Sequence, residues 1–243
     1  MRKILLNIFC AFIPSKRLRK KIRRLCPRRT RYSSENTVHI PKNLKNIDIV
    51  LSGKKNYVLI DDNIDNKSRI KIRVYGDGNS IIIGSCFSCI SIQLGYGDGR
   101  RVYNSSFNLS DGGIINSANF LIIENDTSIN IGNECMFSSN IEFRCTDDHV
   151  ILNENNEVIN LAKSIEIGNH VWIGKDVLVL KNSVIPDGCI VGAKSVIAKK
   201  FTKKNTVIVG NPARVVKENI HWKSDCPDMY DNAKNGRNLW ERK

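Results

Sequence analysis

The chain has few cysteines, the residues whose disulfides stabilise small secreted folds: only eight of its 243 residues are cysteines. They are widely spaced and do not form the dense framework of a disulfide-rich secreted domain, so reduced thiols are expected. Cys86 and Cys89 form a C-x-x-C pair. No second pair stands at the spacing that a structural zinc site requires, so two small core residues are the favoured interpretation and no metal is expected to be required.

Acidic residues are absent from the first 31 residues, which carry twelve lysines and arginines. From Tyr32 onward the chain has 26 basic and 24 acidic residues, so most of the net charge of +14 belongs to the amino terminus. Aromatic residues are not interleaved with these charges, as a surface for single-stranded nucleic acid would require. No nucleic-acid partner is therefore expected.

The amino terminus also lacks a small-residue cleavage site and an apolar run of membrane-spanning length. Its apolar stretch, residues 4–13, is too short to cross a bilayer, and Pro14 and the basic run 16–24 follow it. Segment 1–31 is expected to form a short basic amphipathic helix. It is either an interfacial anchor on anionic lipid, each basic side chain contributing about 1 kcal/mol, or a solvated helix. The anchor predicts a cytoplasmic protein, peripheral on the inner face of the cytoplasmic membrane.

A six-residue period runs through the last third of the chain. Aliphatic residues recur at every sixth position, and they are Ile167, Ile173, Val179, Ile185, Val191 and Ile197. An α-helix repeats at 3.6 residues and a half-buried strand at two, so this period indicates a short strand plus a turn. Three such units close one triangular coil of a parallel β-helix, with the aliphatic side chains inside. Ile167 is then predicted to stack on Ile185, and Ile173 on Val191.

The pattern weakens toward the amino terminus. Residues 38–125 still alternate apolar and polar side chains between Gly, Asp and Asn turns, and we interpret them as irregular coils of the same helix. Two segments, residues 95–101 and 145–163, interrupt the coils.

The predicted organisation is all-β. A basic segment over residues 1–31 precedes a β-helix domain over 32–215. Residues 216–243 form a C-terminal cap and tail, because the open end of stacked strands must be covered.

Three segments in this region carry a resemblance to a known family. They are Ile167-Gly-Asn-His-Val-Trp-Ile-Gly174, Ile190-Val-Gly-Ala-Lys-Ser-Val196 and Val209-Gly-Asn-Pro-Ala-Arg214, the last followed by Asn219-Ile-His-Trp222. In order and spacing they resemble the hexapeptide-repeat acyltransferase superfamily, in particular its sugar and polysaccharide O-acetyltransferases. The resemblance implies a left-handed parallel β-helix, a homotrimer, and transfer of an acetyl group from acetyl-CoA to a saccharide hydroxyl of a capsular or lipopolysaccharide-type surface glycan.

The resemblance also implies catalytic roles for the second interruption. His149 is expected to be the general base, because a sugar hydroxyl attacks a thioester poorly until its proton is removed, and imidazole titrates near neutral pH. Attack would be direct, with both substrates held together. Asp148 or Asp147 would orient the imidazole. His170 is the alternative base, although an exposed turn residue is the simpler interpretation.

Trp172 points outward from a regular coil in the predicted repeat. By resemblance it lies near the histidine, where its N–H supports the oxyanion or its ring contacts the acceptor sugar, and the alternative is an aromatic residue in the trimer interface.

For acetyl-CoA, the family pattern implies small residues beside the pantetheine arm and basic residues beside the phosphates. The matching positions are Lys175, Ala193, Ala198, Lys199, Arg214 and Lys217. Lys175 departs from the small residue common at its position.

Two other functions fit the same residues. One is a non-catalytic, membrane-docked β-helix scaffold, and the other is an N-acetyltransferase of an amino sugar.

Overall fold

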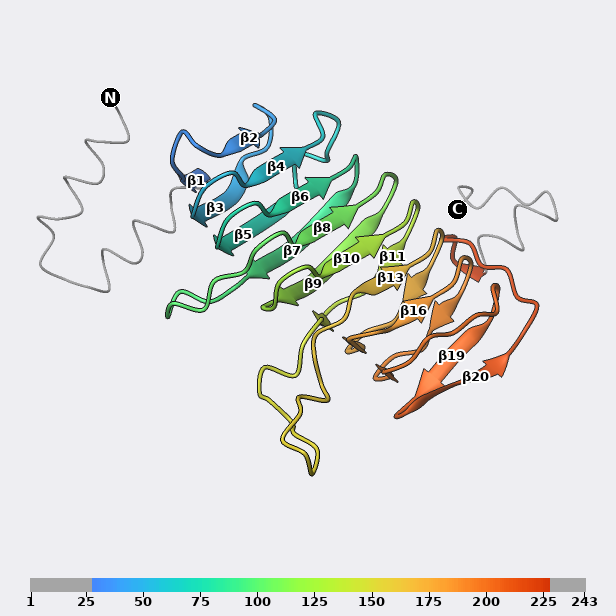
Figure 1. Cartoon of the computed structure of the whole chain (residues 1–243). Helices are drawn as coiled ribbons and strands as arrows, with labels where there is room; N and C mark the ends of the chain where they lie inside the picture. Colours follow the sequence, from blue (N-terminus) through green and yellow to red (C-terminus); the bar gives the residue numbers. More distant parts are fainter. Residues whose placement is uncertain (1–27, 228–243) are drawn as a thin grey trace, which may run out of the picture.

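The computed structural model describes residues 28–227, whose strands stack as coils of a left-handed parallel β-helix with three faces (Figure 1). The predicted fold class is therefore confirmed. The predicted basic helix spans residues 1–31, of which residues 1–27 lie outside the described residues, whereas Arg28–Arg31 form a strand. Among residues 28–227, no helix has the length and apolarity needed to span a bilayer.

The first face is a seven-stranded sheet. Its strands are β2 (Thr37–His39), β4 (Tyr57–Ile60), β6 (Ser80–Ile83), β8 (Ser106–Leu109), β10 (Ser128–Ile131), β13 (Ile165–Ile167) and β16 (Val184–Ile185).

The second and third faces belong to one continuous sheet, because β7 (Phe87–Leu94) and β9 (Ile114–Ile122) bend across both. The second face holds β11 (Met136–Phe137), β14 (Trp172–Ile173), β17 (Ile190–Val191), β19 (Val207–Gly210) and β20 (Ala213–Lys217). The third face holds β1 (Arg28–Arg31), β3 (Asn46–Ser52), β5 (Arg69–Tyr75), β12 (Ile141–Arg144), β15 (Leu178–Leu180) and β18 (Val196–Ile197).

The predicted stacking of the repeat is confirmed. Ile167 pairs with Ile185 and Ile173 pairs with Val191, and all four side chains are buried. A glycine follows the aliphatic residue in several units because successive coils approach closely there. A Cβ on Gly174 would lie 2.7 Å from the backbone nitrogen of Ala193, so a larger residue would push the coils apart.

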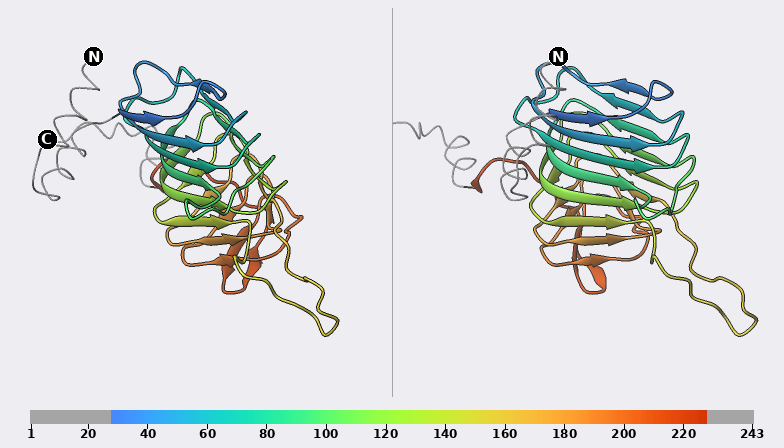
Figure 2. Two further views of the ribbon diagram at one scale, coloured as in Figure 1. Left: turned by 60° about the vertical axis from the view of Figure 1, so that its left-hand side comes forward. Right: turned by 90° about the vertical axis from the view of Figure 1, so that its left-hand side faces the viewer.

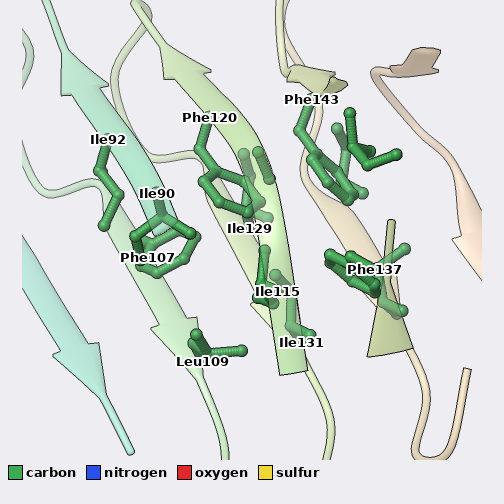
Figure 3. Close-up of a cluster of buried hydrophobic side chains, with 14 of the residues drawn as sticks. Ile90, Ile92, Phe107, Leu109, Ile115, Phe120, Ile129, Ile131, Phe137 and Phe143 are labelled. Carbon is green, nitrogen blue, oxygen red and sulfur yellow. The ribbon is translucent and has the colours of Figure 1, made fainter. Parts of the chain in front are cut away.

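The middle coils contain a stack of phenylalanines (Figure 3). The Phe120 ring lies 4.6 Å from that of Phe107 and 4.7 Å from that of Phe143, and Phe137 lies 5.7 Å from Phe143. These larger rings fill coils whose strands are longer than those of the regular repeat.

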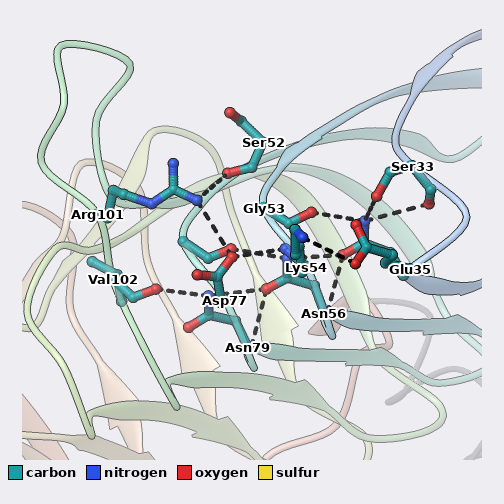
Figure 4. A network of polar contacts seen from close by, with 12 residues as sticks. Ser33, Glu35, Ser52, Gly53, Lys54, Asn56, Asp77, Asn79, Arg101 and Val102 are labelled. Atoms are coloured by element: carbon teal, nitrogen blue, oxygen red, sulfur yellow. Dashed lines mark hydrogen bonds and ion pairs between the residues drawn. The ribbon is translucent and has the colours of Figure 1, made fainter.

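The amino-terminal coils, predicted to be irregular, stack in register along a ladder of buried asparagines (Figure 4). The amide oxygen of Asn36 accepts hydrogen bonds from the backbone and side-chain nitrogens of Asn56, and Asn56 does the same for Asn79. The Asn79 amide oxygen accepts from the backbone nitrogen of Ser105. Each rung therefore fixes the turn of the next.

Both ends of the described chain depart from the stacking of complete coils. Residues 28–31, which the sequence placed in the basic segment, form β1 and pair with residues 47–50 of β3. At the other end, β20 folds back antiparallel on β19 and closes the stack (Figure 1).

Candidate functional site

Residues 145–164, named the arm, leave the third face after β12 and return to the first face at β13. They project far from the helix as an irregular hairpin with one bridge, between Leu152 and Val158 (Figure 2). The arm corresponds to the second interruption in the sequence, and it emerges from the corner between the third and first faces.

Glu124 anchors both ends of the arm. Its carboxylate accepts a hydrogen bond from the Thr146 hydroxyl, and its other oxygen accepts one from the backbone nitrogen of Ala162 at 3.0 Å. Because Thr146 is buried, this contact is shielded from water and holds the two strands of the arm together at their root.

Asp147, two residues before His149, also forms hydrogen bonds at the root of the arm. Asp147 accepts from the Lys181 ammonium at 2.6 Å and from the side chain of Asn160 at 2.9 Å. These hydrogen bonds, from Lys181 above all, hold the pKa of Asp147 below its ordinary value. The Asn160 amide also donates to the backbone oxygen of His149 at 2.9 Å, which fixes the backbone at the histidine.

The His149 side chain is exposed, and no described residue hydrogen-bonds to its imidazole. Asp148 turns the other way. Its carboxylate accepts from Arg100 at 2.7 Å and from the Tyr96 hydroxyl at 3.2 Å, both in the loop of residues 95–101. In the single chain, therefore, neither Asp147 nor Asp148 touches the imidazole, and Asp148 ties the arm to that loop.

The loop of residues 95–101 is stabilised by a cation–π contact and an ion pair of Arg100. The Arg100 guanidinium lies 4.0 Å from the centre of the Tyr96 ring and pairs with Asp98 at 2.9 Å. These hydrogen bonds lower the pKa of Asp98, while burial and the nearby Asp148 raise the pKa of Tyr96. This contact between the two interruptions could not be predicted from the sequence, because 48 positions separate Arg100 from Asp148.

Trp172 lies on the outer side of the second face with 37% of its surface exposed. It belongs to an apolar row that runs up this face, composed of Ile114, Met136, Trp172, Ile190 and Val207. An exposed apolar row on a regular sheet is typical of a surface that binds another molecule or another copy of the chain.

His170 holds the C-terminal segment against this face. Its ring stacks on Trp222 with 4.0 Å between ring centres, and Trp222 Nε1 donates to the His170 backbone oxygen at 3.0 Å. His170 Nε2 lies 3.1 Å from the Trp222 oxygen. His170 thus holds the C-terminal segment in place through Trp222, whereas a free turn residue was the simpler expectation. The ring centres of Trp222 and Trp172 are 6.0 Å apart.

The structure does not bring His149 and Trp172 together within one chain. The arm springs from the corner between the third and first faces, whereas Trp172 faces outward from the second face on the opposite side of the triangle. No contact between these two side chains is present among the described residues.

Three of the residues assigned to acetyl-CoA by resemblance lie at the corner between the second and third faces. Lys175 and Ala193 are exposed in consecutive coils, and the backbone oxygen of Lys175 accepts from Lys194 at 2.9 Å. Arg214 lies in β20 beside the hairpin of β19, whose Gly210 nitrogen donates to Ser195 at 3.0 Å in the same corner.

The other three lie elsewhere. Ala198 and Lys199 are exposed just after β18, at the far end of the third face, where the Lys199 ammonium lies 5.1 Å from the Phe201 ring. Lys217 pairs with Val207 at the start of the second face. Small and cationic side chains are accessible at all these positions, as a donor with a narrow arm and several phosphates requires, but they follow an extended path rather than one pocket.

A cavity of about 390 Å³ opens at the root of the arm, where Ala162 and Ser164 line it. Lys163, Asn182 and Lys200 line it together with Glu166. Its lining is of mixed charge, and Lys200 directly follows Ala198 and Lys199 in the chain.

The described residues define a member of the hexapeptide-repeat acyltransferases. The family model for bacterial transferase hexapeptide (six repeats) matches residues 164–199. The crystal structure of the polysialic acid O-acetyltransferase OatWY superimposes with a TM-score of 0.54 and 30% sequence identity, covering 76% of this chain and 96% of that one. The chain belongs to this family.

Curated relatives agree with that assignment. The polysialic acid O-acetyltransferase of Neisseria meningitidis is 37% identical over 106 residues, which are 42% of this chain and 49% of the relative. The galactoside O-acetyltransferase of Escherichia coli K12 is 35% identical over 104 residues, 42% of this chain and 50% of the relative. The chain thus spans about half the length of the curated relatives it matches.

Proposed function

We propose that the protein is an O-acetyltransferase that moves an acetyl group from acetyl-CoA to a saccharide hydroxyl of a capsular or lipopolysaccharide-type surface glycan. The observation that carries the proposal is the arm, which presents an unpaired, exposed His149 on a root fixed by Glu124 and Lys181. The relatives named as polysaccharide and sugar O-acetyltransferases support the reaction type.

In this proposal His149 acts as the general base. Its imidazole takes the proton from the acceptor hydroxyl, and the freed oxygen attacks the acetyl carbonyl directly, with no covalent enzyme intermediate. Acetyl-CoA supplies the activated thioester and would be held by Lys175, Ala193, Ala198, Lys199, Arg214 and Lys217. The Trp172 N–H, on the outer face, is suited to support the developing oxyanion or to contact the sugar.

The active form is proposed to be a homotrimer. The arm exposes six apolar side chains, namely Val150, Ile151, Leu152, Val158, Ile159 and Leu161. Apolar surface of this kind favours burial against a partner, and the apolar row around Trp172 offers a matching surface. Contact between two different surfaces of one chain can close into a ring, which would set His149 of one copy beside Trp172 of the next.

Peripheral membrane contact of segment 1–31 stays a prediction, as does the cytoplasmic location that accompanies it.

Product analysis tests the proposed reaction. The full chain is incubated with radiolabelled acetyl-CoA and a panel of bacterial saccharides, including polysialic acid, and the label on each polymer is treated with mild alkali. An O-acetyl ester is released and an amide is retained, so alkali-labile label is expected. Alkali-stable label would mean N-acetylation, and no transfer or hydrolysis with any saccharide would favour a non-catalytic scaffold.

Arm variants test the assembly. Ile159→Asp with Leu161→Asp places two charges in the proposed interface, so light scattering is expected to show a monomer and acetyl transfer is expected to fall more than tenfold. Ile82→Asp, at an exposed apolar position on the first face, is the matched control and should leave both unchanged. A trimer that survives the arm variant would refute the arm's role.

A further inference from the structure

The third face is strongly basic in the amino-terminal coils. The strands β3 and β5 alternate buried and outward side chains, and Arg29 and Arg31 of the neighbouring β1 are exposed. The outward cations of the three strands are Arg29, Arg31, Arg69, Lys71 and Arg73. Asp48 is the one acidic side chain among the described outward residues of these strands, and Arg73 pairs with it. Four exposed cations therefore remain without an acidic partner on this face.

The cations are arranged in rows along the helix axis. Arg29 is in register with Asp48, which is in register with Lys71, and Arg31 aligns in the same way with Val50 and Arg73. Because neighbouring strands lie about 4.8 Å apart, a linear polymer lying along the axis would meet several cations in succession.

The other sides of these coils differ in charge. The outward residues of β2, β4 and β6 on the first face are uncharged apart from His39. Between the first and third faces along the chain, the turn of residues 61–65 carries Asp61, Asp62 and Asp65. The segregation means that an anion is attracted to one face in particular.

This basic face is continuous with the arm through the loop of residues 95–101. A Cβ on Gly97 would lie 3.3 Å from the Tyr75 ring, so the loop packs on the end of β5. Arg101 donates to the Ser52 backbone oxygen at 3.2 Å at the end of β3, while Arg100 holds Asp148 in the arm. The loop of residues 95–101 thus contacts both the end of this basic face and the arm that carries His149.

We propose that the third face of the amino-terminal coils is an extended binding surface for an acidic polysaccharide acceptor. This surface would hold negatively charged sugar units remote from the unit being acetylated. The inference rests on the proposed function. A saccharide polymer fits better than a lipid surface, because docking on a bilayer usually adds inserted apolar side chains. Here the apolar outward residues, Val50 and Tyr75, are partly buried.

Acceptors of two lengths test this surface. The variant Arg29→Gln, Arg31→Gln, Lys71→Gln, which removes exposed cations of both rows, is compared with the control Lys42→Gln, Lys55→Gln, Lys67→Gln, which removes three exposed cations outside the rows. For long polysialic acid, the KM of the row variant is expected to rise roughly tenfold, while kcat and the KM for a short oligomer stay unchanged. The control should behave as the unmodified protein, and higher salt should reduce the length preference.

A binding measurement separates this inference from the reaction. His149→Ala in the full chain is titrated with long polysialic acid, with an uncharged dextran, and with phosphatidylglycerol vesicles. Binding of polysialic acid that is lost in the row variant supports the surface even if no acetyl transfer is ever found. Equal binding of dextran, or row residues needed for vesicles but not for polysialic acid, would overturn it.

Discussion

Replacing His149 by alanine is expected to lower acetyl transfer by about a thousandfold, the loss that follows when a general base is removed. The thermal unfolding midpoint should not change, because the side chain is exposed and its imidazole has no hydrogen-bond partner among residues 28–227. Donor binding should also persist, since the residues assigned to acetyl-CoA lie on the coils rather than on the arm. Initial rates, thermal unfolding and CoA binding measure the three effects.

His221→Ala is the matched control, because His221 is also exposed but lies in the C-terminal segment. It should retain the full rate. If His149→Ala turned over normally, the base would have to be another group, and the arm would then serve assembly alone.

Replacing Asn56 by alanine is expected to lower the free energy of unfolding by about 3 kcal/mol. Asn56 is 1% exposed and makes four side-chain hydrogen bonds, accepting two from Asn79 and donating to Asn36 and to the Gly76 oxygen. Alanine leaves a buried Asn79 backbone N–H and the Gly76 carbonyl without these partners, and each buried orphan is costly.

Asn66→Ala provides the comparison, because Asn66 is exposed at a turn of the same coils and should change stability by less than about 0.5 kcal/mol. Urea unfolding of the two variants measures the difference. Equal stability of both would mean that packing alone, and not the asparagine ladder, sets the register of the amino-terminal coils.

The regular coils could be read from the sequence because their period is local. Ile167 and Ile185 are three units apart and stack as the six-residue spacing predicts. The arm was equally visible as a break in that period, whereas the role of His149 came from the family resemblance and stays a prediction. Each of these features depends on residues that are close in the chain, so no knowledge of distant contacts was needed.

The asparagine ladder was missed because its members are 20 and 23 positions apart, and coils of unequal length hide the period. The partners of Asp148 were missed for the same reason. Trp222 lay inside a quoted motif, but its stacking on His170 joins residues 52 positions apart and only the folded chain shows it.

The sequence alone determined the stacked triangular coils, since a short hydrophobic period commits each unit to the same strand and turn whatever lies further along the chain. Tertiary structure decided how the chemistry is distributed. It turned Asp148 toward Arg100, set His149 and Trp172 on opposite sides of the triangle, and gathered the cations of separate coils on one face. Those relations depend on which corner each loop leaves and on how many residues each coil contains. Because they combine the lengths of many distant segments, only the folded chain determines them.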